Sequence, residues 1–160
     1  MKYTILEISK KFKLFVYQQT STKNFKDIES LYKKNNIDFK LFNFDEKIFE
    51  YISMSNLAIT RSGASALSEL AFLQVPFIAI PYPYAKDNHQ FENAIFFQNM
   101  NYGWIFDQTK LKKKELFNFL ENIIENNSEY LDKKRSIMDY RNQNLWNKIN
   151  NKLKEIINEN

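Results

Sequence analysis

The stretch from Leu57 to Ala94 constrains the fold of this chain more than any other. It contains two short apolar runs, 57–60 and 77–80, and each is followed by a turn of small or polar residues and then by helical periodicity. Strand, turn and helix repeated in this order are typical of a parallel sheet, because parallel strands need a crossover connection. Both turns are then expected at the carboxyl edge of the sheet, where ligands bind in open α/β folds.

The composition fits one soluble domain. The chain has 160 residues, of which 44% are hydrophobic and 16% aromatic, and this supports a sizeable core. It has no cysteine, which excludes disulfides and thiolate metal sites. The sequence does not open with a signal-peptide pattern, and no uncharged apolar run approaches the ~18 residues of a membrane span. We therefore expect a soluble chain.

The net charge of +4 does not indicate nucleic-acid binding. Only three of the 23 basic residues are arginine, and the lysines alternate with acidic residues, as in Lys112-Lys113-Lys114-Glu115. Scattered lysines suffice for weak attraction to an anionic membrane surface. We expect no nucleic-acid partner.

The rest of the chain alternates between predicted strands and helices. The apolar spacing predicts an α/β fold, a Rossmann-like parallel sheet of about five strands with helices on both faces. The predicted strands span 13–18, 37–44, 57–60, 76–80 and 103–106. The predicted helices span 1–11, 25–34, 46–54, 66–73, 88–100, 111–125, 128–140 and 143–158. Asn24 is expected to cap the helix that starts at residue 25.

The first turn, Ser62-Gly63-Ala64-Ser65, has two interpretations. Small side chains let a ligand approach the backbone, and the first N–H groups of the following helix lack partners, so the turn could hold a phosphate. An ordinary strand-to-helix turn capped by Ser62 or Ser65 is equally compatible with these residues. Glu69 could bind a pair of sugar hydroxyls. A solvated or capping glutamate is the simpler local interpretation.

The second turn, Asp87-Asn88-His89-Gln90, precedes another predicted helix. Asp87 or Asn88 can cap that helix, which leaves His89 and Gln90 in its first turn. Imidazole and amide groups suit the recognition of sugar hydroxyls. A single histidine without cysteine is a poor metal site. The nucleophile pattern G-x-S-x-G is absent, which argues against a hydrolase.

Taken together, the two turns resemble the C-terminal half of the MurG family, which belongs to glycosyltransferase family 28 and has the GT-B fold. The resemblance is carried by R-S-G-A-S at 61–65, Glu69, Pro81, Pro83 and D-N-H-Q-x-x-N-A at 87–94. It extends more weakly over residues 12–110. It implies a UDP-N-acetylglucosamine-dependent hexosyltransferase that needs no metal or other cofactor. It also implies that 1–110 form the nucleotide-sugar domain and that 111–160 are C-terminal helices of the same domain.

The resemblance further implies roles for individual residues. The helix-opening residues would take the diphosphate, and Glu69 the ribose hydroxyls. His89 and Gln90 would contact the N-acetylglucosamine, and the backbone at Asp45 the uracil. The full predicted substrate-binding set is Asp45, Ser62, Gly63, Ala64, Ser65, Ala66, Leu67, Ser68, Glu69, His89, Gln90 and Asn93.

The resemblance also indicates parts of the family enzyme that this sequence does not contain. In the family, an N-terminal domain binds the lipid acceptor and carries the proposed catalytic base, so we expect no catalytic residue in this chain. The first, central strand of the nucleotide domain is also expected to be missing. The predicted strands 13–18 and 57–60 would then flank an empty slot. A split enzyme completed by a partner chain, a truncated product and direct pairing of these two strands remain open.

The expected function is to bind UDP-N-acetylglucosamine as the donor half of the transferase that converts lipid I to lipid II in peptidoglycan synthesis. Lipid I would be held by the missing N-terminal domain or by a partner chain, and this chain alone would be inactive. The expected location is the cytoplasm or, peripherally, the cytoplasmic face of the inner membrane. The alternative is a non-catalytic remnant, or the nucleotide-sugar-binding subunit of a split glycosyltransferase similar to the two-chain dolichol-type enzyme.

Overall fold

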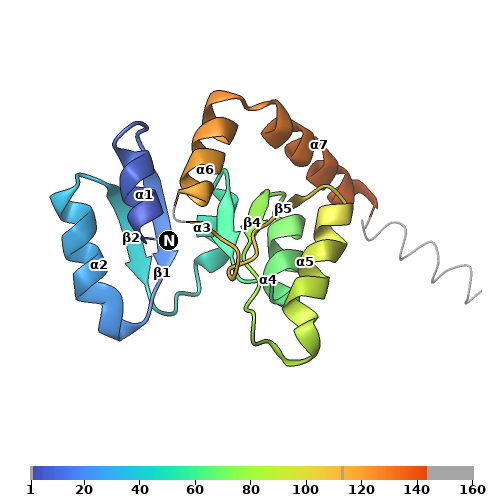
Figure 1. The fold of residues 1–160 in the computed structure, drawn as a ribbon, viewed down its shortest axis with the longest axis horizontal. Coiled ribbons are helices and arrows are strands. Elements are labelled where there is room, and N and C mark those ends of the chain that lie inside the picture. The colour runs from blue at the N-terminus through green and yellow to red at the C-terminus, as the bar shows by residue number, and fades with distance from the viewer. Residues whose placement is uncertain (1, 113, 144–160) are drawn as a thin grey trace, which may run out of the picture. The chain divides into compact units, whose positions relative to one another are not determined.

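The computed structural model describes residues 2–112 and 114–143 (Figure 1). Helices and strands alternate along the chain, as the apolar spacing predicts. In order, the elements are α1 (Lys2–Ser9), β1 (Phe15–Gln19), α2 (Thr22–Lys34), β2 (Asp38–Phe42), α3 (Ile48–Ser53), β3 (Ala58–Thr60), α4 (Ala64–Phe72), β4 (Phe77–Ala79), the 3₁₀ turn η1 (Lys86–Asn88), α5 (His89–Asn99), β5 (Gly103–Ile105), α6 (Glu115–Glu125) and α7 (Ser128–Gln143).

The predicted elements are present, with shifted ends. The clearest error is the start of α2, which begins at Thr22 rather than at 25, so that Asn24 lies inside its first turn. Ser21 occupies the capping position, and its side chain makes no capping hydrogen bond. The helix predicted over 143–158 lies, apart from residue 143, outside the described residues.

The five strands are parallel, as predicted, but they form two sheets instead of one. β1 pairs with β2, and β4 pairs with both β3 and β5. Within the described part of the chain no ladder joins β1 to β3. The division falls between the two strands that the sequence predicts on either side of an empty slot.

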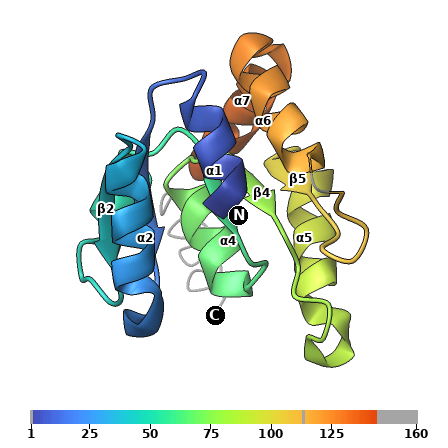
Figure 2. The same ribbon diagram turned by 60° about the vertical axis from the view of Figure 1, so that its left-hand side comes forward.

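The chain forms two compact units that are interleaved along the sequence. The first unit contains the chain up to Ser55 together with residues 111–127, and the second contains residues 56–110 together with α7. In the first unit α1 contacts α6 and α2 contacts β2 (Figure 1). In the second unit α4 contacts both α5 and α7, and α4 and α5 run side by side in Figure 2. The assignment of 1–110 to one nucleotide-sugar domain stays a prediction.

The core of the first unit lies between α2 and the β1–β2 sheet. Ile28, Tyr32, Ile37 and Leu41 form a buried cluster there. Tyr32 is completely buried, and its hydroxyl donates to Oε1 of Gln18 at 2.6 Å. Burial raises the pKa of Tyr32. The bond satisfies the one polar atom of a large core side chain and ties α2 to β1.

The core of the second unit is built around β4. All three residues of β4 are buried, and the strand is paired along both edges. This accounts for the uninterrupted apolar run of the sequence, because a central parallel strand has no face that needs polar side chains. The first strand-to-helix turn follows β3, beside β4, and the second follows β4 itself.

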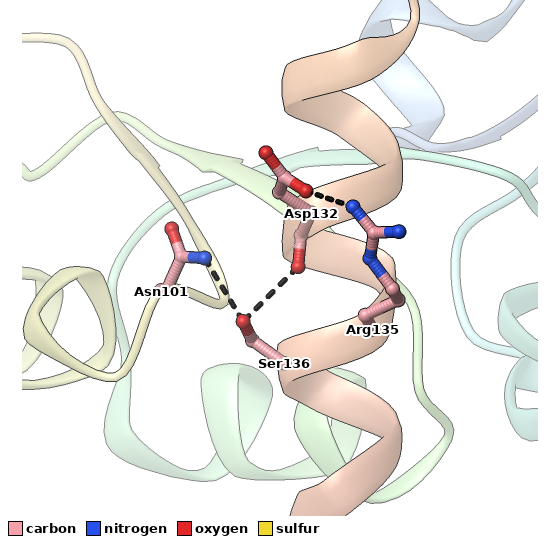
Figure 3. A network of polar contacts seen from close by, with 4 residues as sticks. All are labelled: Asn101, Asp132, Arg135 and Ser136. Carbon is pink, nitrogen blue, oxygen red and sulfur yellow. Dashed lines mark hydrogen bonds and ion pairs between the residues drawn. The ribbon is translucent and has the colours of Figure 1, made fainter.

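Helix α7 is attached to the second unit by a polar network at Asn101, in the turn after α5 (Figure 3). Nδ2 of Asn101 donates to Oγ of Ser136 at 2.9 Å, and Oδ1 accepts from Nζ of Lys133 at 2.7 Å. Oγ of Ser136 also donates to the carbonyl oxygen of Asp132. Lys133 is 7% exposed, and burial lowers its pKa. The ion pair of Arg135 with Asp132 is exposed and adds little stability.

Candidate functional site

The first turn of the site lies between β3 and α4. Gly63 is the N-cap residue of α4, and no side chain makes a capping hydrogen bond to it. The expectation that Ser62 or Ser65 caps this helix is therefore wrong. The backbone donors at the start of α4 are left without side-chain partners.

Three of these donors are available to a ligand. The N–H groups of Ala64, Ser65 and Ala66 precede the first intrahelical donor, which is the N–H of Leu67; it donates to the carbonyl oxygen of Gly63 at 3.0 Å. They lie at the positive end of the helix dipole, which favours an anion. Leu67 has a fully buried side chain and a paired N–H, so it is a core residue with neither group available to a ligand. Ser68 is exposed and presents only its hydroxyl.

Neither the backbone angles nor the packing of Gly63 requires a glycine. Its φ is −65° and its ψ is 137°, a conformation that any residue adopts. A Cβ atom built at Gly63 meets no heavy atom within 4 Å. Gly103 differs, since a Cβ there would lie 2.3 Å from the carbonyl oxygen of Phe77. The open space at Gly63 adjoins the free donors of α4, as expected where a ligand approaches the backbone.

Ser62 is completely buried, and its two polar groups differ in their pairing. The carbonyl oxygen accepts from Nδ2 of Asn93 at 3.0 Å. The hydroxyl Oγ has no hydrogen-bond partner among the described residues. Leaving such a buried hydroxyl unpaired costs about 1–3 kcal/mol. An unpaired buried group next to the turn fits a site that a ligand completes.

Glu69 lies four residues after Ser65, so the two share one face of α4. Its side chain is half-buried. No hydrogen bond or ion pair of its carboxylate is described in residues 2–112 or 114–143, so both oxygens are open to a hydroxyl pair. The alternative of a capping glutamate has no support, because no side chain caps α4.

The second turn is built from two consecutive left-handed residues. Asp87 has φ 50° and Asn88 has φ 55°, and α5 begins immediately afterwards at His89. Asparagine and aspartate adopt this conformation more readily than other non-glycine residues. Asn88 occupies the capping position, as predicted for one of the two residues, but makes no side-chain capping bond.

His89 is exposed, and its Nδ1 lies 2.6 Å from the carbonyl oxygen of Lys86. A carbonyl can only accept, so Nδ1 carries the hydrogen. In the neutral ring, Nε2 is then an acceptor that faces away from this bond. Gln90 uses Oε1 to accept from the N–H of Tyr82 at 2.9 Å. The predicted site residues in Ser62–Glu69 and His89–Asn93 all belong to the second unit.

Asp45 belongs to the first unit, unlike the other predicted site residues. Its Oδ1 accepts from the N–H of Lys47 at 3.0 Å, and its Oδ2 accepts from the hydroxyl of Tyr51 at 2.7 Å. These bonds, that of Lys47 above all, hold the pKa of Asp45 below its usual range. The bond with Asp45 also raises the pKa of Tyr51 to about 12. The uracil contact proposed for the backbone at Asp45 stays a prediction.

The substitution Tyr51→Phe is expected to raise the pKa of Asp45 toward its ordinary 3.8, because one of its two donors is removed. Ionised Asp45 contributes stability above its unfolded pKa, and this is lost as pH falls through the lower folded pKa. Carbon NMR of the Asp45 carboxyl through an acid titration measures the shift. Tyr17→Phe is the matched control, because Tyr17 stacks on Tyr51 at 5.1 Å and its hydroxyl contacts Met54. An equal shift in both variants would contradict the assignment.

Three further observations concern hollows, metal ligands and membrane-spanning helices among the described residues. A hollow of about 350 Å³ in the first unit is lined by residues 9–14 and 36–38, and none of the predicted site residues lines it. In the described ranges no group of three or more His, Asp or Glu side chains is placed to hold a metal ion. No described helix has both the length and the apolar character needed to cross a membrane.

Comparison with known sequences gives a consistent result. Residues 2–154 match the family described as "Glycosyltransferase family 28 C-terminal domain". A UDP-N-acetylglucosamine--N-acetylmuramyl-(pentapeptide) pyrophosphoryl-undecaprenol N-acetylglucosamine transferase from Pelagibacter ubique is 45% identical over 160 residues, 100% of this chain and 45% of the relative. The transferase of the same name from Campylobacter fetus is 38% identical over 108 residues, 68% of this chain and 32% of the relative. The chain thus spans less than half the length of these curated relatives.

Solved structures support the fold. The crystal structure of Acinetobacter baumannii MurG matches with a TM-score of 0.71 and 22% identity, and the match covers 86% of this chain and 40% of that chain. The solution structure of ALG13 matches with a TM-score of 0.51 and 16% identity, over 78% of this chain and 75% of that chain. At these identities the matches support the mixed α/β fold with parallel strands.

Proposed function

Because the chain belongs to the glycosyltransferase family 28 C-terminal domain family, we propose that it binds UDP-N-acetylglucosamine as the donor half of an N-acetylglucosaminyltransferase. The family predicted from the R-S-G-A-S and D-N-H-Q motifs is the one that residues 2–154 match. The name of the relative that is 45% identical gives the donor and the acceptor class of that enzyme. The local geometry supports the roles that we propose for individual residues.

In this proposal the diphosphate lies against the free N–H groups of Ala64, Ser65 and Ala66. The carboxylate of Glu69, on the same face of α4 as Ser65, accepts from the two ribose hydroxyls. His89 presents Nε2 and Gln90 presents Nε2H₂ to the sugar, since the opposite atom of each side chain already contacts the backbone.

The observation that carries the proposal is the open space at Gly63. Neither the backbone angles nor the packing of the turn requires a glycine there. The free donors of α4 lie in the same short segment. A diphosphate accounts for both observations, because it needs close backbone approach and several donors.

We propose that lipid I is bound, and its attacking hydroxyl deprotonated, by a polypeptide segment or partner that joins this chain, so that lipid II is formed at the cytoplasmic face of the inner membrane. We assign no metal or other cofactor to this chain. In this proposal the free N–H groups of α4 stabilise the negative charge of the diphosphate.

Titration calorimetry of the full chain with UDP tests the donor site. Glu69→Ala is expected to weaken UDP binding about tenfold, because two hydrogen bonds to a half-exposed carboxylate contribute about 0.7 kcal/mol each after exchange with water, or about 1.4 kcal/mol together. Glu29→Ala is the matched control, since Glu29 forms only an exposed ion pair with Lys33 in the first unit. An unchanged dissociation constant in Glu69→Ala would remove the ribose role.

The transferase proposal has a separate test. The full chain alone is expected to transfer no sugar from UDP-N-acetylglucosamine to lipid I, and transfer is expected once the acceptor-binding polypeptide is added. Turnover by the chain alone would contradict the donor-half assignment. Absence of any UDP binding by the wild type would favour a non-catalytic remnant.

A further inference from the structure

Three side chains join the first turn of the candidate site to the segment between β4 and the second turn, and we name Arg61, Gln90 and Asn93 the turn clamp. Nη1 of Arg61, which follows β3, donates to the carbonyl oxygen of Ile80 at 3.0 Å and to that of Pro81 at 3.3 Å. Its guanidinium lies 5.6 Å from the ring centre of Tyr82. Arg61, just before the first turn, is thereby hydrogen-bonded to Ile80 and Pro81, just after β4.

Helix α5 forms the other side of the turn clamp. Gln90 and Asn93 are three residues apart and share one face of this helix. Gln90 accepts from the N–H of Tyr82, between β4 and the second turn, and Asn93 donates to the carbonyl oxygen of Ser62 in the first turn. One helix face therefore holds the first turn and the segment that leads into the second.

The chemistry of the backbone partner fixes which atom of Asn93 is used. The carbonyl oxygen of Ser62 can only accept, so the amide must present its NH₂ group to it. One of the two N–H donors of the Asn93 amide is thus occupied by the protein itself. This bond acts one residue before Gly63 and two residues before the first free donor of α4.

We propose that Asn93 is a positioning residue for the diphosphate site: it holds Ser62, and with it the start of α4, in the orientation that presents the free N–H groups to the diphosphate. The inference rests on the proposed function, because it names the part of the donor that the residue serves. It assigns to the Asn93 amide group a contact with the protein, in place of the direct substrate contact that the sequence predicts.

Binding of three ligands of increasing length separates a positioning role from a sugar contact. Asn93→Leu is nearly isosteric and neutral, and it leaves the Ser62 carbonyl without its donor. In calorimetry on the full chain we expect unchanged affinity for uridine and about tenfold weaker affinity for both UDP and UDP-N-acetylglucosamine. A loss confined to UDP-N-acetylglucosamine, an equal loss for uridine, or no loss at all would overturn the proposal.

A ligand-free measurement keeps the test independent of the proposed function. Nitrogen–proton NMR of the full chain is expected to show shifted or broadened backbone amides at Gly63, Ser65 and Ala66 in Asn93→Leu, and unchanged ones in the control Asn99→Leu, an exposed position on the same helix. Unchanged amides in Asn93→Leu would overturn the positioning role. If the wild type binds no UDP, the proposed function fails, and this NMR comparison still decides whether Asn93 holds the turn.

Discussion

The substitution Gly63→Ala is expected to weaken UDP binding about a hundredfold while the chain stays fully folded. A methyl group at this position would enter the open space beside the N–H groups of Ala64, Ser65 and Ala66. Moving the diphosphate away would weaken one or two charge-assisted hydrogen bonds, about 3 kcal/mol in total. This figure corresponds to about two orders of magnitude in the dissociation constant.

Neither the backbone angles nor the surroundings of Gly63 destabilise this variant, although alanine is less favourable than glycine at an N-cap by about 0.5–1 kcal/mol. The φ of −65° suits alanine, and no heavy atom within 4 Å opposes the new methyl group. Alanine also reduces the freedom of the unfolded chain by about 0.4–1 kcal/mol, which offsets the N-cap loss, so the free energy of unfolding should change by less than about 1 kcal/mol. Calorimetry with UDP and urea denaturation measure the two quantities. Undiminished UDP affinity, or a clear loss of stability, would contradict the role assigned to Gly63.

The substitution Gly103→Ala is expected to have the opposite effect: a large loss of folding stability without direct removal of a UDP contact. In Gly103→Ala the new Cβ would lie 2.3 Å from the carbonyl oxygen of Phe77 and 2.8 Å from its ring. A backbone oxygen of the central strand cannot yield without displacing β5 from β4. We expect a loss of about 3 kcal/mol or more in the free energy of unfolding, because overpacking against backbone lies at the upper end of the usual range.

Such a loss is a large fraction of the 5–15 kcal/mol that is typical of a folded domain. The midpoint of urea denaturation, compared between Gly103→Ala, Gly63→Ala and the wild type, measures it with one chemical change in two environments. The folded fraction of Gly103→Ala should bind UDP as tightly as the wild type, so any apparent loss of affinity should equal the unfolded fraction of the second unit. A midpoint equal to that of the wild type would show that β5 adjusts to the methyl group.

The sequence predicts the elements well because their signals are local. The apolar run at β4 and the helical spacing of α6 each depend on residues within a few positions of one another. The two turn motifs are local as well, and they sufficed to identify the family. The start of α2 was missed because Asn24 and Ser21 are both good capping residues, and neither side chain forms the capping bond in the structure.

The contacts that organise the site are not local and could not be predicted in this way. Asn93 and Ser62 are 31 residues apart, and Arg61 reaches carbonyl groups 19 and 20 residues away. Periodicity carries no information on such pairs. The signal that could have suggested them is the presence of an arginine and two amides beside turns with many backbone groups to satisfy.

The division of the strands into two sheets is a different case. A strand pattern shows that a segment pairs, but it does not name the neighbour on each edge. Both β1 and β3 have the apolar character of internal strands, yet each pairs along one edge in the described chain. The expectation of an empty slot came from the family resemblance, and the ladder break falls at the same place.

The interleaving of the two units affects how the chain can fold during synthesis. Helix α6 packs on α1, and Lys11 forms an ion pair with Glu121, so the first unit is incomplete until residues after β5 have left the ribosome. At ~10 residues per second this delay lasts several seconds, during which all three strands of the second unit emerge. The strands of the second unit are thus exposed before α6, the last helix of the first unit, has been synthesised. A nascent chain interrupted after residue 110 would leave both units without their closing helices.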